Sequence, residues 1–61
     1  MGRVKAEHFK VGDLVFHRIF EDDAFRLGIV IGHDWSKNAV YVRWSAGKKV
    51  YHIPEMLKRL E

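Results

Sequence analysis

Four histidines, at His8, His17, His33 and His52, are the side chains of this 61-residue chain best suited to metal or acid–base chemistry. Their spacing reproduces no short metal motif such as His-x-x-x-His, and the chain has no cysteine to complete a site. No serine or cysteine nucleophile pattern accompanies them. Folding could bring His17 to His52 across strands, or His33 to Asp34. The sequence therefore predicts no catalytic residue, no metal site and no cofactor, and we expect surface or half-buried histidines.

An acidic run inside the polar segment 20–26 is the second cluster that could do chemistry. It lacks the ligand spacing of a calcium loop, but it could contact a basic partner. Large aromatic residues flank it, and another lies in a later turn. A core this small cannot enclose all of them, and exposed aromatic residues are typical of protein interfaces. The predicted protein interface comprises Phe20, Glu21, Asp22, Asp23, Phe25 and Trp35.

Basic residues form the third set, in a chain of net charge +3 and sequence pI near 9.5. Tyr41 and Arg43 share the outward face of a predicted strand, and Lys48 and Lys49 lie at the turn that follows it. Aromatic and basic side chains on one sheet face suit single-stranded nucleic acid, through base stacking and phosphate contacts. The alternative is an ordinary charged surface that keeps sheet edges from pairing. The nucleic-acid candidates are Arg18, Lys37, Tyr41, Arg43, Lys48 and Lys49.

The elements that would position these side chains are short strands separated by turns. Apolar segments of strand length predict strands over 14–19, 27–33, 39–45 and 49–53. The third has the clearest period-two alternation, with Val40, Val42 and Trp44 on one face. Glycines inside the second indicate a bulge or sharp curvature. Pro54 ends the fourth, and a single helical turn with a closing strand should follow it; the alternative is a helix over 54–61.

The length allows one domain, which we expect to comprise a loose N-terminal arm over 1–10 and a barrel over 11–61. Phe9 and Val11 are expected to anchor the arm at the first strand. A chain of this size buries only about 60% of the surface that its unfolded form exposes, so its stability should be small. The chain has no long apolar stretch and no cysteine, which favours a cytoplasmic protein.

The succession Gly12-Asp13-Leu14-Val15, Gly28-Ile29-Val30, Val40-Tyr41-Val42-Arg43-Trp44 and Ile53-Pro54 resembles the Src-homology-3-like (SH3-like) small barrels. These include Tudor, KOW and chromo-like modules, and small proteins of tailed phages are the most similar. The resemblance implies an all-β fold: a five-stranded SH3-like barrel with a single helical turn before the last strand.

For function, the same resemblance implies a non-catalytic binding module. The first expectation is a phage-type accessory or structural protein that acts through protein–protein contacts or self-association, in the host cytosol or the virion. The alternative is a nucleic-acid-binding module of the KOW or Tudor kind. A remote alternative is an oligomeric pore enzyme, because Val50-Tyr51-His52-Ile53-Pro54 is similar in place to the pore strand of type II dihydrofolate reductase.

Overall fold

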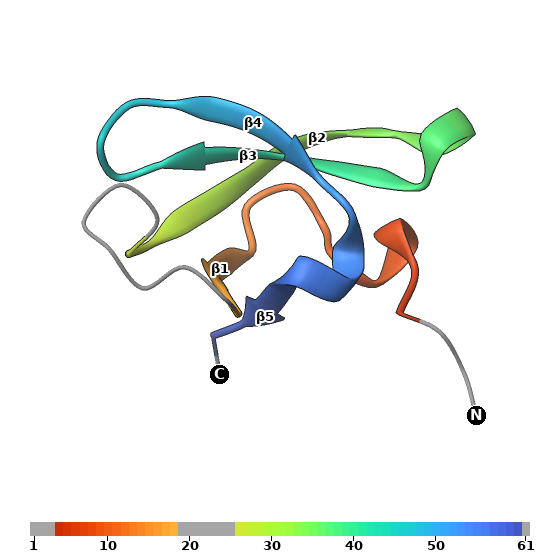
Figure 1. Ribbon diagram of the computed structural model, residues 1–61, viewed down its shortest axis with the longest axis horizontal. Helices are drawn as coiled ribbons and strands as arrows, with labels where there is room; N and C mark the ends of the chain where they lie inside the picture. The colour runs from red at the N-terminus through yellow and green to blue at the C-terminus, as the bar shows by residue number, and fades with distance from the viewer. Residues whose placement is uncertain (1–3, 19–25, 61) are drawn as a thin grey trace.

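One antiparallel sheet of five strands organises the protein in its computed structural model, which describes residues 4–18 and 26–60 (Figure 1). The strands are β1 (Leu14–His17), β2 (Gly28–Asp34), β3 (Ala39–Trp44), β4 (Lys49–His52) and β5 (Leu57–Arg59). The described residues also form single 3-10 turns: η1 (Ala6–His8) before β1, η3 (Trp35–Lys37) between β2 and β3, and η4 (Pro54–Met56) between β4 and β5. The all-β prediction is confirmed. Within the described ranges, no helix is long and apolar enough to cross a membrane.

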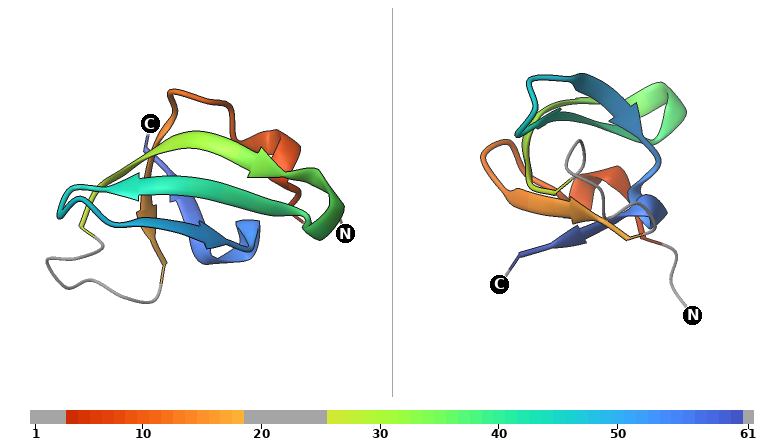
Figure 2. Two further views of the ribbon diagram at one scale, coloured as in Figure 1. Left: turned by 90° about the horizontal axis from the view of Figure 1, so that it is seen from above. Right: turned by 60° about the vertical axis from the view of Figure 1, so that its left-hand side comes forward.

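The strand order is β4-β3-β2-β1-β5, with every neighbouring pair antiparallel. Strands β2, β3 and β4 form a meander, and the pair β1 and β5 crosses beneath them (Figure 2). Among the described residues no pairing joins β4 to β5, so the sheet is not closed into a hydrogen-bonded barrel. Pro54 has no N–H to continue the ladder, which explains why β4 ends before it. The turn η4 then leads the chain into β5, which pairs with β1.

The C-terminal segment follows the first of its two predicted alternatives. Pro54 is the first residue of η4 and is buried, and Leu57 begins β5 with 3% of its surface exposed. The Arg18 N–H donates to the Met56 carbonyl and the Leu60 N–H to the Leu14 carbonyl, which extends the pairing of β1 with β5 at both ends. The turn followed by a strand is confirmed, and a helix over 54–61 is wrong.

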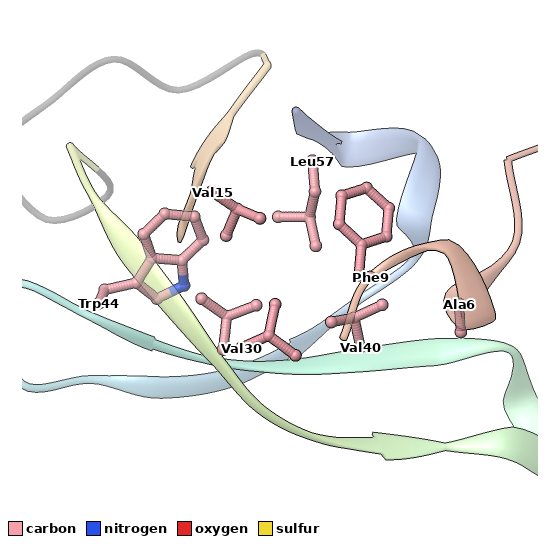
Figure 3. Packing of buried hydrophobic residues seen from close by; sticks show 8 residues of the cluster. Ala6, Phe9, Val15, Val30, Val40, Trp44 and Leu57 are labelled. Atoms are coloured by element: carbon pink, nitrogen blue, oxygen red, sulfur yellow. The ribbon is translucent and has the colours of Figure 1, made fainter. Parts of the chain in front are cut away.

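The core lies between the meander and the crossing pair (Figure 3). Alternation along β3 points Val40, Val42 and Trp44 inward, each at most 1% exposed, as predicted. Valines from the neighbouring strands meet them at paired positions, since Val42 pairs with Val30 on β2 and with Val50 on β4. Among the described residues, the buried cluster comprises Ala6, Phe9, Val15, Val30, Val40, Val42, Trp44 and Leu57.

The N-terminal segment is part of this core, which differs from the loose arm expected over 1–10. Within residues 4–10, Ala6 is fully buried and Phe9 is 5% exposed, whereas Val11, expected to help anchor the arm, is 65% exposed. The Ala6 N–H donates to Asn38 Oδ1 at 2.8 Å, and the His33 ring contacts the Phe9 carbonyl. Five short strands leave one end of the core uncovered, and burial of Ala6 and Phe9 there adds apolar area that a small domain needs.

A bulge in β2 confirms the irregularity indicated by its glycines. The register with β3 shifts between Val30 and Gly32: Val30 pairs with Val42, and Gly32 with Tyr41. The extra residue, Ile31, has no partner in this register and is 36% exposed. The bulge lets β2 curve over the core. It also places Gly32 beside Tyr41, on the side of the sheet that faces away from the core.

Candidate functional site

The side of the sheet that faces away from the core carries two rows of cross-strand neighbours, which together we call the outer face. The first row runs across four strands, and the second across β2, β3 and β4. Because neighbouring residues of a strand point to opposite sides, both rows alternate with the buried valines. The first row is Leu14, Ile29, Arg43 and Lys49, and the second is Gly32, Tyr41 and Tyr51.

Two tyrosines stack on each other in the second row. The rings of Tyr41 and Tyr51 have centroids 4.2 Å apart and planes inclined by 17°, and Tyr51 is 53% exposed. Gly32 stands on the other side of Tyr41, where a Cβ would lie 3.8 Å from that side chain. Because Gly32 has no side chain, it does not cover the pair of stacked tyrosine rings, which we call the tyrosine platform, from the β2 side.

A tight turn sets the register of this tyrosine pair. Gly47 adopts φ 97°, which favours glycine, and its N–H donates to the Trp44 carbonyl. The Trp44 N–H in turn donates to the Lys48 carbonyl at 2.7 Å, which closes the β3–β4 hairpin. Sequence reasoning placed Tyr41 in the site but missed Tyr51. Symmetric counting from the predicted strands 39–45 and 49–53 would have paired Tyr41 with Ile53, and the pairing with Tyr51 follows from the tighter turn that Trp44 and Lys48 close.

Two cations are neighbours in the first row. Arg43 on β3 pairs with Lys49 on β4, and both are exposed. Like charges opposite one another destabilise a sheet. Within residues 4–18 and 26–60 the single ion pair joins Arg59 to Asp13, neither of which lies on β3 or β4. No described carboxylate therefore forms an ion pair with Arg43 or Lys49. An anion bound between the two side chains would relieve their repulsion.

One acidic residue lies directly beyond the tyrosine row, because Asp34 on β2 pairs with Ala39, two residues before Tyr41 on β3. Within β2, β3 and β4 the single carboxylate is that of Asp34, at the far end of β2. Its Oδ1 accepts a hydrogen bond of 2.7 Å from Ser36 Oγ, and this bond is the main cause that lowers the pKa of Asp34 below its ordinary value. The Asp34 carboxylate is thus engaged by Ser36 in the turn that follows β2, whereas Arg43 and Lys49 lie one row from the tyrosines in the other direction.

The structure brings some of the predicted nucleic-acid-binding residues together and places others elsewhere. Of the nucleic-acid candidates, Tyr41, Arg43 and Lys49 meet on the outer face, and Lys48 is exposed in the adjoining turn. Arg18 follows β1 and Lys37 lies in η3, so neither belongs to the two rows.

Of the predicted protein interface, the structure describes one residue. Trp35 is 65% exposed at the β2–β3 turn, with its ring stacked 4.2 Å from the His33 ring. The remaining candidates, Phe20, Glu21, Asp22, Asp23 and Phe25, lie outside the described residues.

A histidine pair, His17 buried and His52 half-buried, occupies the core side of the sheet. The His17 and His52 rings meet edge to face with centroids 5.1 Å apart, so the contact considered from the sequence forms. The Trp44 Nε1–H donates to His52 Nε2 at 3.0 Å. His17 is 4% exposed, and the expectation of a surface or half-buried position is wrong for it because β1 turns this side chain into the core. Among the described residues, no three potential ligands converge as a metal site would require.

Protonation of His52 should destabilise the fold. Burial, and second the repulsion from His17, lower the pKa of His52 below its ordinary value of 6.5. A lowered histidine pKa means that the unfolded chain binds the proton more tightly than the folded protein does. The free energy of unfolding is therefore at its full value with respect to His52 above about pH 6.5, and it falls as the pH drops towards the folded-state pKa. We expect urea midpoints to fall on acidification through this range, and His52→Gln, which keeps an acceptor for Trp44, to reduce the fall. His8→Gln, outside the cluster, is the control; an equal reduction in both variants would contradict the assignment.

No family model, curated protein or solved structure matches the chain. The function is therefore argued from the geometry of the outer face.

Proposed function

We propose that the protein binds single-stranded nucleic acid on its outer face. The observation that carries this proposal is the stacked pair Tyr41–Tyr51 next to the exposed cations Arg43 and Lys49. Bases offer a flat apolar surface to an aromatic ring, and each base stacked on an aromatic side chain contributes about 1–3 kcal/mol to binding. Single strands rather than duplexes fit, because only unpaired bases can turn a face to the tyrosines.

Each part of the face has a separate task in this proposal. The exposed ring of Tyr51 receives a base on its free face, and Tyr41 stacks against the other face of that ring and supports it. Arg43 and Lys49 bind the phosphates on either side of that base, which also removes the cost of placing two cations side by side. Because the face has no sequence-reading amide or carboxylate pair beside the tyrosines, the tyrosine platform should tolerate any base.

We also infer that the fold is an SH3-like small barrel of the nucleic-acid-binding kind. The five antiparallel strands, the bulge in β2 and the single 3-10 turn η4 before β5 support this assignment. It agrees with the resemblance of the sequence to KOW and Tudor modules.

The salt dependence of oligonucleotide binding tests the proposal. Fluorescence anisotropy of a labelled oligothymidylate should show binding at low salt, with log K falling against log salt at a slope of about −1.4 for two phosphate contacts on a single strand. The double variant Arg43→Gln/Lys49→Gln should bring this slope close to zero. Arg18→Gln/Lys37→Gln removes the same charge from outside the outer face and should keep the wild-type slope. Absence of binding at low salt, or equal slopes in both double variants, would refute the proposal.

A further inference from the structure

We propose that a shallow depression beside Arg43 receives one unstacked base of the bound strand, next to the base on the tyrosines. This inference rests on the proposed function and adds a second base site to it. The depression has a volume of about 300 Å³ and lies where β1, β2 and β3 adjoin. It is lined by Leu14, Leu27, Gly28, Ile29, Arg43, Trp44 and Ser45.

Three exposed aliphatic side chains contribute to this lining. Leu14, Leu27 and Ile29 are 42%, 39% and 37% exposed, and all three border the same depression. Leu14 and Ile29 are direct cross-strand neighbours, and the Ser45 N–H donates to the Leu27 carbonyl at 2.8 Å. The three side chains are therefore held together by the sheet, and a ligand that covers them removes apolar area from water without rearranging the backbone.

Arg43 connects the depression to the tyrosine platform. It borders the depression on one side and pairs with Lys49 on the other. Strands in a sheet are about 4.8 Å apart, so the middle of the depression on β2 lies roughly 10 Å across the sheet from β4. A nucleic-acid strand whose phosphate contacts Arg43 must therefore pass directly beside the depression.

The lining matches the chemistry of a base. A base has apolar faces, which would contact the leucine and isoleucine side chains, and a polar edge, which needs hydrogen-bond partners. Arg43 and Ser45 are the lining residues with polar side chains, and arginine donates well to acceptors on base edges. An aliphatic side chain of a protein partner would use the apolar lining but leave these two polar groups without a role.

Methyl NMR on the full chain tests this second site. Titration with an oligothymidylate of about 6 nucleotides should shift the methyl resonances of Leu14, Leu27 and Ile29. It should also give intermolecular NOEs from them to thymine base protons. Leu27→Gln, which keeps the side-chain size but adds a polar group, should weaken binding about 5-fold. The matched control Leu60→Gln changes a leucine that is 49% exposed outside the depression and should bind as the wild type does.

The outcomes separate the two proposals. Shifts confined to the Tyr41 and Tyr51 rings, with wild-type affinity in Leu27→Gln, would overturn the second base site and leave the proposed function standing. A titration in which no resonance shifts at low salt would overturn both. Weakening by Leu27→Gln together with base-to-methyl NOEs would establish the site.

Discussion

Tyr51→Ala is expected to weaken oligonucleotide binding about 5- to 100-fold, because it removes the exposed half of the tyrosine platform. Stacking of a base on an aromatic side chain contributes about 1–3 kcal/mol, and each 1.4 kcal/mol changes affinity tenfold. The ring is 53% exposed on the edge strand β4, so its loss should leave the core intact. Anisotropy titrations at one low salt concentration measure the effect, and circular dichroism confirms that the variant is folded.

Two controls make this result specific to the platform. Tyr51→Phe keeps the ring and loses the hydroxyl, so it should bind within about twofold of the wild type if stacking dominates. Trp35→Ala removes a more exposed aromatic side chain, 65% accessible at the β2–β3 turn, and should not change binding. Equal weakening by Trp35→Ala and Tyr51→Ala would move the binding surface away from the outer face. A large loss in Tyr51→Phe would mean that the hydroxyl, rather than the ring, carries the contact.

Gly28→Ala is expected to lower the free energy of unfolding by roughly 2–3 kcal/mol, as overpacked core substitutions do. A Cβ at this position would lie 2.5 Å from Val42 Cγ1 and 2.8 Å from Trp44 Cε3. Both neighbours are almost completely buried, so neither can move aside without disturbing the core. A domain of this length has only roughly 3–9 kcal/mol of stability, so the variant should be partly unfolded at moderate temperature. Urea denaturation followed by tryptophan fluorescence measures the change.

Gly32→Ala is the matched control for this effect, since it makes the same change four residues further along β2. Its Cβ would lie at an ordinary 3.8 Å from Tyr41, and the backbone there is not left-handed. Replacing a strand glycine by alanine reduces the freedom of the unfolded chain, so this variant should be as stable as the wild type or more stable by up to about 1 kcal/mol. If the two variants lost equal stability, crowding against Val42 and Trp44 could not be the reason for the loss in Gly28→Ala.

The fold could be predicted from the sequence wherever the cause is local. The period-two alternation in 39–45 predicted that Val40, Val42 and Trp44 face the core, and they do. The missing N–H of Pro54 predicted the end of the fourth strand, and η4 begins there. These features depend on neighbouring residues and on backbone chemistry, so no knowledge of the rest of the chain was needed.

Predictions failed where a distant segment decides the outcome. Ala6 was expected in a loose arm, yet together with Phe9, the expected anchor of that arm, it fills the end of the core left open by the sheet. His17 has the polarity of a surface residue, but β1 directs it to His52 and Trp44. The burial of each depends on a surface formed by other strands, which local periodicity does not contain.

The sequence by itself determined the strands, their turns and the outward direction of Tyr41 and Arg43. Only the tertiary structure decided which side chains are their neighbours. Tyr51 stacks on Tyr41, and Arg43 lies between Lys49 and the depression lined by aliphatic side chains. The physical reason is that strand pairing and register are cooperative properties of the whole sheet. A shift of one residue in that register would send every one of these side chains to the opposite side.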